Sequence, residues 1–123
     1  MMRTASLEQA ELAIIGAGCA GLSLARQLVR TEKTSSIKAC LYGPVSPAAT
    51  NRHSWGFWAT QGLKEQTELA RQRWHKWQII TAKRKVTQTA DSHPYCRLDS
   101  RDWLTHCLNI IDGNIPVSYT HLT

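Results

Sequence analysis

An apolar run followed by three closely spaced glycines is the feature that most constrains the fold of this chain. The run Leu12–Ile15 predicts a short buried strand, and Gly16, Gly18 and Gly21 follow it in the order G-x-G-x-x-G. After the glycines, apolar residues recur at the spacing of a helix. A strand, a glycine turn and a helix in this order are the context in which the motif predicts a dinucleotide-binding turn.

Each glycine has its own physical role in such a turn. Gly16 permits the tight turn out of the strand, Gly18 lets the backbone approach a pyrophosphate, and Gly21 allows the helix to pack close to the strand. Free backbone N–H groups and the positive end of the helix dipole then point at the phosphate oxygens. The same pattern also occurs in units that bind no ligand, so that alternative stays open. The candidate phosphate contacts are Gly16, Ala17, Gly18, Cys19, Ala20 and Gly21.

A second strand is predicted at Ile37–Tyr42, after a polar connection. A strand, a helix and a strand within about 30 residues form a right-handed βαβ unit with parallel strands. In dinucleotide-binding units, an acidic residue near the end of the second strand binds the ribose hydroxyls. Tyr42 occupies that place here, so the usual carboxylate contact is missing and the side chain offers one hydroxyl instead.

Composition narrows the class of protein. The chain has 123 residues, of which 42% are hydrophobic and 20% charged, and this fits one modest soluble domain with a core. No apolar stretch approaches the roughly 20 residues of a membrane-spanning helix. Residues 1–10 lack the apolar region of a secretory signal, and we expect them to form a flexible N-terminus.

Charge and cysteine usage argue against two kinds of site. The net charge is +6, yet Lys83–Lys85 is the one basic cluster, so we expect no nucleic-acid partner and at most a mild preference for anionic membranes. The four cysteines form no C-x-x-C pair and lie at no zinc-ligand spacing. We therefore expect no metal site, and reduced, buried cysteines in a cytosolic compartment.

The segment Asn51–Trp58, which reads N-R-H-S-W-G-F-W, is unusually aromatic for the loop in which we place it. Composition alone leaves two interpretations open. One is a hydrophobic plug beneath the loop. The other is the aromatic wall of a ligand pocket, with Arg52 near an anionic group.

Three elements are predicted after this segment. Apolar residues at helical spacing predict a helix over Gly62–Trp77, with a weak pair between Glu68 and Arg71 on its outer face. The runs Gln78–Thr81 and Val86–Thr89 predict a hairpin that turns at the basic cluster.

A short strand and a helix are predicted towards the end of the chain. Tyr95–Leu98 reads as the strand, and Asp99 as the N-cap of the helix, with Asp102 placed to complete a capping box. Gly113 ends the helix. The buried face of this helix is predicted to consist of Trp103, Leu104, Cys107, Leu108 and Ile111.

The last seven residues, 117–123, match the translation of a transposase adapter used in sequencing libraries. They follow Asn114–Pro116, where the sheet would gain its next strand. We predict that residues 117–123 are a non-native read-through tail. Residues 11–116 are then part of a larger α/β domain.

The glycine turn together with Asn51–Trp58 resembles the N-terminal part of the flavin-dependent lycopene cyclases. In that family an aromatic segment of the type Asn/Arg-Thr-Trp-x-Phe-Trp follows the second strand, and Ser54 stands here in place of the threonine. His93–Tyr95 and the helix Arg101–Leu108 resemble the next block of the family. The resemblance covers Glu11–Asp112.

The resemblance implies a fold, a cofactor and a reaction. The fold is the N-terminal part of a Rossmann-like FAD-binding domain, built from the βαβ unit with a hairpin and a helix, and incomplete here. The family binds FAD non-covalently and closes the linear ends of lycopene into rings without net redox change. Reduced flavin is held to stabilise a carbocation while a carboxylic acid protonates the end-group double bond. Members sit on membranes, which implies a cytoplasmic protein peripheral to the membrane.

The resemblance also bears on individual residues. It makes the glycine turn the pyrophosphate site and adds Arg101 as a flavin-side contact to the candidates Tyr42 and Arg52. The catalytic acid lies in the later part of the family's chain, so no catalytic residue is assigned here, and we expect this chain to be inactive by itself. One alternative is an FAD-dependent oxidoreductase of the same fold, such as a monooxygenase or a prenyl reductase. Another is a nucleotide-binding module that is not an enzyme.

Overall fold

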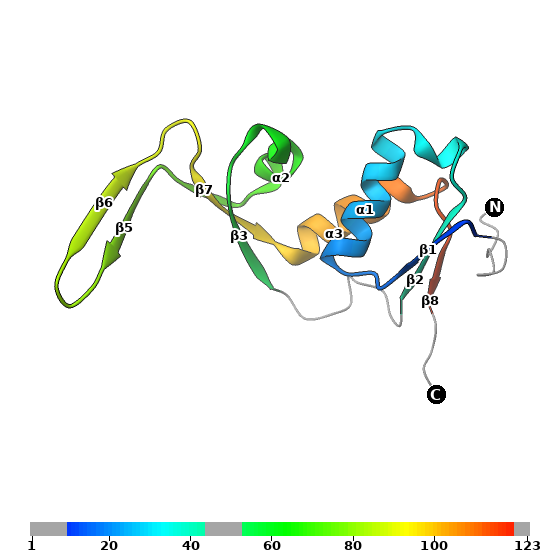
Figure 1. The fold of residues 1–123 in the computed structure, drawn as a ribbon, viewed down its shortest axis with the longest axis horizontal. Helices are drawn as coiled ribbons and strands as arrows, with labels where there is room; N and C mark the ends of the chain where they lie inside the picture. Colours follow the sequence, from blue (N-terminus) through cyan, green and yellow to red (C-terminus); the bar gives the residue numbers. More distant parts are fainter. Residues whose placement is uncertain (1–9, 44–52, 120–123) are drawn as a thin grey trace. The chain divides into compact units, whose positions relative to one another are not determined.

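The computed structural model describes residues 10–43 and 53–119, which fall into two compact units (Figure 1). The first unit is formed by Met1–Asn51 together with Trp103–Thr123, and the second by Arg52–Asp102. The helix α3 (Ser100–Ile111) starts in the second unit and continues in the first.

The first unit contains a three-stranded parallel sheet in the order β1-β2-β8 (Figure 1). Leu12 lies opposite Ala39, and Ile15 lies opposite Tyr42. The predicted strand, helix and parallel strand are thereby confirmed, but the burial predicted for β1 is wrong for most of the strand. Ile14 faces α1 and is buried, whereas Ile15 is 74% exposed because successive side chains of a strand point to opposite faces of the sheet. The elements in chain order are β1 (Leu12–Ile15), α1 (Cys19–Arg30), the 3-10 helix η2 (Lys33–Ser35), β2 (Ala39–Gly43) and β8 (Val117–Tyr119).

The core of the first unit lies where α1 packs on β1 and β2, with α3 supplying a large aromatic side chain. Leu22 and Ala25 of α1 are fully buried. Trp103 of α3 is 1% exposed, and its indole N–H donates a hydrogen bond to Ser23 Oγ at 2.9 Å. The Arg26 guanidinium lies 5.2 Å from the centroid of the Trp103 ring. The apolar face predicted for α3 is confirmed for Trp103, Leu104, Cys107 and Ile111, which are buried, whereas Leu108 is only partly buried.

The second unit contains two antiparallel sheets. In the first sheet β7 lies between β3 and β4, and in the second β5 pairs with β6. The hairpin predicted at the basic cluster is confirmed as β5–β6 (Figure 1). The elements in chain order are β3 (Ser54–Trp58), η4 (Gln61–Leu63), α2 (Lys64–Leu69), β4 (Gln72–Trp74), β5 (Lys76–Ile80), β6 (Lys85–Thr89) and β7 (Tyr95–Asp99).

The helix predicted over Gly62–Trp77 is wrong in its second half. Helical structure ends at Leu69, and Ala70 has an extended backbone with φ −61° and ψ 133°. The backbone N–H of Arg71 then donates to the carbonyl oxygen of Arg97 at 3.0 Å, next to the pairing of β4 with β7. This pairing satisfies the backbone groups of β4 that face β7, and Ala70 is buried. Tertiary pairing therefore overrides the local helical spacing.

The loop predicted for Asn51–Trp58 is wrong for the residues that form β3. β3 pairs with β7 along its whole length, from Ser54 opposite Asp99 to Trp58 opposite Tyr95. Tryptophan and phenylalanine favour strands because their side chains pack on a pleated surface. The segment also contains a glycine and a serine, which are common in loops, and these residues weakened the strand signal of the aromatic side chains.

The start of α3 has the predicted cap. The carboxylate of Asp99 accepts a hydrogen bond from the backbone N–H of Arg101 at 2.9 Å. Asp102, which we expected to complete a capping box, binds the side chain of Arg71 through both carboxylate oxygens. That contact takes the place of the predicted Glu68–Arg71 pair. Past the end of the helix, Gly113 has φ +79°, a conformation that glycine adopts without strain.

The cysteines are free, as predicted, but they are not all buried. Cys40, Cys96 and Cys107 are buried, whereas Cys19 is exposed because it opens α1 at the outer side of the glycine turn. Among the residues that the structure describes, every helix is too short or too polar to cross a lipid bilayer. Residues 117–119 form β8, and their origin as read-through stays a prediction.

Candidate functional site: a glycine turn at the carboxyl end of β1

The turn after β1 is built on two glycines that no other residue could replace without displacing the backbone. Gly16 has φ +110°, which side chains rarely allow, and its N–H donates to the carbonyl oxygen of Tyr42 at 2.7 Å. A Cβ on Gly21 would lie 1.9 Å from the carbonyl oxygen of Gly16 and 3.3 Å from Cγ2 of Ile14. The first turn of α1 is therefore pressed against the end of β1.

The outer side of the turn is open. Apart from Gly18 itself and its two chain neighbours, no described residue has an atom within 4 Å of the place that a Cβ on Gly18 would take, and Gly18, Cys19 and Ala20 are exposed. Among the described residues, no side chain caps the N-terminus of α1, and its first turn carries no acidic residue. The first backbone N–H groups of a helix lack partners within the helix, and its dipole is positive at this end.

These observations test whether the turn fits the diphosphate of a dinucleotide. A diphosphate needs close backbone approach, several N–H donors and positive potential. The open position at Gly18 permits the approach, and the uncapped start of α1 supplies the donors and the potential. The residues present therefore fit such a group.

Gly43 is a residue of the turn that the sequence analysis missed. A Cβ on Gly43 would lie 2.8 Å from Cβ of Ala17, inside the glycine turn. A larger residue at the end of β2 would therefore push Ala17 outward. The signal was present in the sequence as a glycine directly after the apolar residues of the second strand.

Tyr42 lies half-buried beside the turn, near the end of β2. Partial burial raises the pKa of its phenol above the ordinary value, and a hydrogen bond with the side chain of Cys40 raises it further. The hydroxyl thus has a partner within the chain. The predicted contact between Tyr42 and a ribose stays a prediction.

The second unit carries a pocket of about 420 Å³ with aromatic walls. The ring of Trp58 lies 5.4 Å from that of Trp77 and 4.9 Å from that of Tyr95, measured between centroids. Phe57 points to the other face of β3 and packs on a buried cluster. Phe57 therefore packs in the core, while Trp58 lines a pocket. That this pocket binds a ligand, with Arg52 near an anionic group, stays a prediction. The pocket is lined by Trp58, Trp77, Gln88, Thr89, Ala90 and His93.

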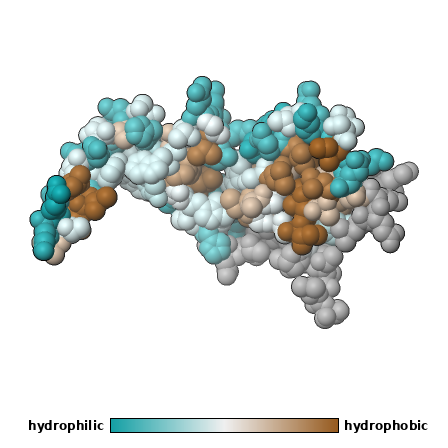
Figure 2. All heavy atoms as spheres, in the orientation of Figure 1, coloured by the Kyte–Doolittle hydropathy of each residue, from teal (hydrophilic) through white to brown (hydrophobic). Residues whose placement is uncertain are grey.

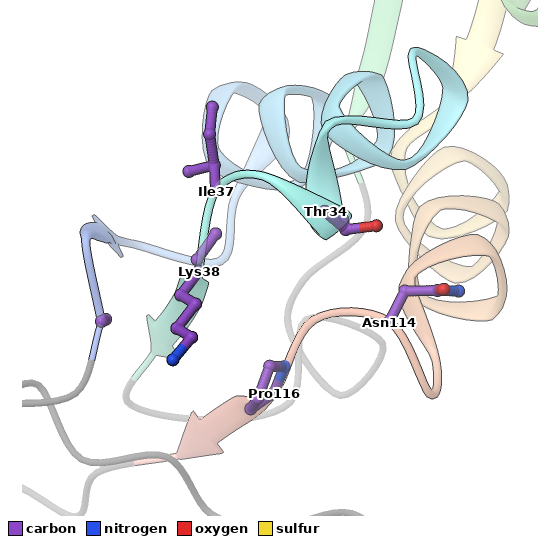
Figure 3. Close-up of a pocket in the computed structure, with 7 residues that line it drawn as sticks. Thr34, Ile37, Lys38, Asn114 and Pro116 are labelled. Carbon is purple, nitrogen blue, oxygen red and sulfur yellow. The ribbon is translucent and has the colours of Figure 1, made fainter.

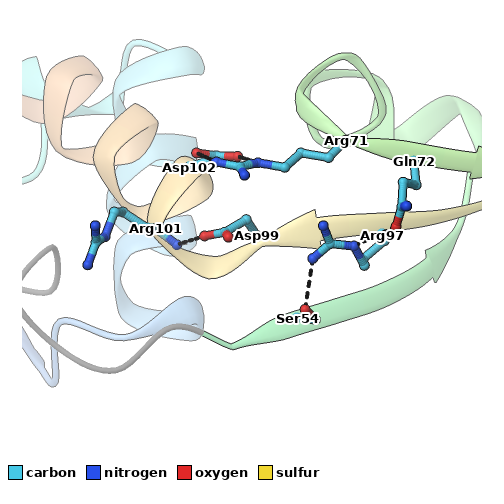
Figure 4. Close-up of polar contacts among 7 residues, drawn as sticks. All are labelled: Ser54, Arg71, Gln72, Arg97, Asp99, Arg101 and Asp102. Carbon is cyan, nitrogen blue, oxygen red and sulfur yellow. Dashed lines mark hydrogen bonds and ion pairs between the residues drawn. The ribbon is translucent and has the colours of Figure 1, made fainter.

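Arginines in the second unit are engaged in contacts between elements (Figure 4). The Nε of Arg71 donates to Asp102 at 2.7 Å, and this carboxylate raises the pKa of Arg71. Arg97 donates to Gln72 at 2.8 Å and to Ser54 at 2.9 Å. These side chains tie β3, β4, β7 and α3 together, which is a structural role.

Two predicted contacts of the cofactor lie elsewhere. Arg101 is exposed on the first turn of α3, with its side chain directed away from the other residues drawn in Figure 4. Arg52 lies outside the described residues. The flavin contacts of both arginines stay predictions.

A second cavity, of about 510 Å³, lies in the first unit at the amino ends of β2 and β8 (Figure 3). Ligands of open parallel sheets bind at the carboxyl ends of the strands, where the glycine turn lies. This cavity is therefore not the dinucleotide site. It is lined by Ala10, Thr34, Ile37, Lys38, Ala39, Asn114 and Pro116. Within residues 10–43 and 53–119, no cluster of three potential metal ligands is found.

Comparison with protein families matches residues 11–111 to the family described as lycopene cyclase protein. Comparison with curated proteins gives no match.

Solved structures share the fold at low sequence identity. PqsL of Pseudomonas aeruginosa, in complex with 2-aminobenzoylacetate, superimposes with a TM-score of 0.68 at 14% identity, over 89% of this chain and 33% of that chain. A further structure of PqsL, described as a probable FAD-dependent monooxygenase, gives a TM-score of 0.63 at 15% identity, over 91% and 32%. The tetrameric form of 2-methyl-3-hydroxypyridine-5-carboxylic acid oxygenase gives 0.63 at 14%, over 88% and 30%. The chain spans about a third of the length of these structures.

Proposed function

Because this chain belongs to the lycopene cyclase protein family, we propose that it is the FAD-binding N-terminal part of a lycopene cyclase. The open glycine turn carries the FAD-binding part of the proposal, and the family match over residues 11–111 carries the cyclase part. The βαβ unit is then the start of a Rossmann-like domain, and the ADP part of FAD lies along the carboxyl end of β1.

In this proposal the chain binds and orients the cofactor. The N–H groups at the start of α1 hold the diphosphate, and the bare backbone of Gly18 allows it to approach. Gly21 and Gly43 keep α1 and β2 tight against the turn, so that the N–H donors are fixed before binding. Reduced FAD, when bound, supplies electron density that stabilises positive charge on a carotenoid. The acid that protonates lycopene is assigned to no residue of this chain.

A redox function is the second candidate. The structural neighbours include FAD-dependent monooxygenases, and the glycine turn serves such enzymes equally well. The aromatic segment Asn51–Trp58 favours the cyclase, because its resemblance is to lycopene cyclases. The carotenoid substrate is a membrane solute, so the full protein is proposed to act on the cytoplasmic side as a peripheral membrane protein.

Cys19 provides a direct test of cofactor binding at the turn. It is exposed, whereas Cys40, Cys96 and Cys107 are buried, so iodoacetamide should modify Cys19 first. Burial raises the pKa of Cys96 and slows its reaction further. FAD should protect Cys19, and Gly18→Val should abolish the protection because its side chain fills the open approach. Modification of Cys19 at an unchanged rate with saturating FAD would contradict binding at this turn.

The reaction is tested in a chimera. Residues 11–111 of this chain replace the matching part of an active lycopene cyclase, and the chimera is expressed in cells that accumulate lycopene. Cyclic carotenoids are expected from the chimera, whereas its Gly18→Val variant should yield none. A chimera that binds FAD but leaves lycopene linear would favour the redox alternative. The chain expressed by itself is expected to yield no cyclic carotenoid.

A further inference from the structure

The hairpin β5–β6 is largely uncovered in the described part of the second unit. Every residue of its two strands is exposed except Trp77, which is partly buried. A two-stranded hairpin without a covering layer is marginally stable in water. Exposed apolar side chains on such an element therefore point to a surface that contacts something else.

The strand register separates the side chains of the hairpin into two faces. Ile79 lies opposite Val86, and Trp77 lies opposite Gln88, so the three apolar residues share one face. Ile79 is 56% exposed and Val86 is 42% exposed. Figure 2 shows apolar side chains gathered on the hairpin beside strongly hydrophilic ones. The other face is polar apart from Ile80, and it carries Lys76, Gln78, Lys85, Thr87 and Thr89.

The tip of the hairpin is basic and held in a defined turn. The backbone N–H of Thr81 donates to the carbonyl oxygen of Arg84 at 2.7 Å, and the N–H of Arg84 donates to Thr81 Oγ1 at 3.0 Å. Lys83, Arg84 and Lys85 follow one another at this tip. The whole stretch from residue 71 to residue 90 contains no aspartate or glutamate. The hairpin thus joins an apolar face to an uncompensated positive charge.

We propose that the hairpin β5–β6 docks on the surface of an anionic lipid bilayer. The basic tip binds lipid phosphates, and the exposed side chains of Ile79 and Val86 enter the interface between headgroups and acyl chains. Trp77 lies at the base of this face, where its ring packs against that of Trp58. A nucleic acid would match the charge but would leave Ile79 and Val86 in water. The inference rests on the proposed function only in that a carotenoid substrate lies in a membrane.

Vesicle binding tests the proposal on the whole chain. Binding is measured by co-sedimentation with vesicles of phosphatidylcholine alone and with equal mixtures of phosphatidylcholine and phosphatidylglycerol. We expect binding to the mixture that weakens as salt increases, and little binding to phosphatidylcholine. Changing Lys83, Arg84 and Lys85 to glutamine should weaken binding on the order of 100-fold. The matched control changes Lys33, Lys38 and Lys64 to glutamine, which removes the same charge outside the hairpin and should have a much smaller effect.

A second pair of variants tests the apolar face. Ile79→Thr with Val86→Thr keeps β-branched side chains in the strands and should weaken binding roughly tenfold. Gln78→Ser with Thr87→Ser, on the opposite face, should leave binding unchanged. Equal losses in the two pairs, or equal losses in the two charge variants, would overturn the proposal. So would self-association that is abolished by Ile79→Thr with Val86→Thr while vesicle binding stays intact, because a second copy would then cover the face.

The result for vesicle binding can be distinguished from the result for FAD binding, which tests the proposed function. Gly18→Val should lose FAD protection of Cys19 but bind vesicles like the parent chain. A chain that binds FAD but not anionic vesicles would refute the membrane-docking hairpin alone.

Discussion

The two units differ most clearly in how deeply a tryptophan side chain is buried in each. Trp103 in the first unit is 1% exposed, and its indole N–H has a partner in Ser23. Trp74 in the second unit is 42% exposed and stacks on Tyr95 at a centroid distance of 6.3 Å. In the first unit Trp103 is buried against α1, whereas in the second unit Trp74 remains partly in water beside Tyr95. Burial therefore depends on the layers around a residue rather than on its type.

The same contrast separates the functions proposed for the two units. The glycine turn owes its shape to contacts that leave no space for a Cβ, as at Gly21 and Gly43. The hairpin β5–β6 owes its properties to exposed apolar and basic side chains. A rigid backbone site suits the orientation of a cofactor, and an exposed amphipathic face suits contact with a surface.

The largest expected effect distinguishes the two tryptophans. Trp103→Ala should lower the free energy of unfolding by about 3–5 kcal/mol, because it leaves a large cavity. Trp74→Ala should lower it by about 1 kcal/mol or less, since much of the side chain is already in water. Urea unfolding followed by far-UV circular dichroism measures both, and hydrogen exchange of the α1 amides reports on the first unit. Similar losses of unfolding free energy in the two variants would contradict the difference in burial between Trp103 and Trp74.

The second largest expected effect on the free energy of unfolding comes from substitutions in the glycine turn. Gly21→Ala should lower the free energy of unfolding by about 2–3 kcal/mol, because the new Cβ meets the backbone of Gly16. Gly18→Ala should change it by no more than about 1 kcal/mol, since its position is open. Thermal melts of the two variants provide the measurement. If Gly18→Ala were the more damaging change, Gly18 would be a packing residue and the open approach would be wrong.

The smallest effect concerns the ion pair of the second unit. Arg71 and Asp102 meet at 2.7 Å, but their side chains are 45% and 29% exposed. A double-mutant cycle with Arg71→Gln and Asp102→Asn should give a coupling of about 0.2–1 kcal/mol. The coupling should shrink as salt is added. A coupling that did not respond to salt would mean that the pair is more buried than the structure indicates.

Local patterns allowed the first unit to be predicted closely. The apolar run, the glycine spacing and the second apolar run correctly gave β1, α1 and β2, since each depends on neighbours in the sequence. The cap at Asp99 and the stop at Gly113 were predicted for the same reason. Gly43 was missed because its role is a close approach to Ala17, and sequence does not state which residues approach one another.

The second unit was harder to predict because its pairings are distant in the sequence. The local pattern predicts a helix where β4 lies and a loop where β3 lies, because both strands acquire their structure by pairing with β7. The local spacing of tryptophans around residues 74–77 fits a helix as well as two strands. The local sequence does not distinguish a helix from two strands here, and the pairing with a partner strand makes the difference.

The sequence by itself determined the glycine turn and the family resemblance, because both reside in the identity and spacing of a few residues. Only the tertiary structure decided which part of the turn is packed and which is open, since that depends on atoms brought together by folding. It also decided that the basic cluster stands beside an exposed apolar face. Register between two strands sets which side chains share a face, and register arises from hydrogen bonds that form when the strands pair.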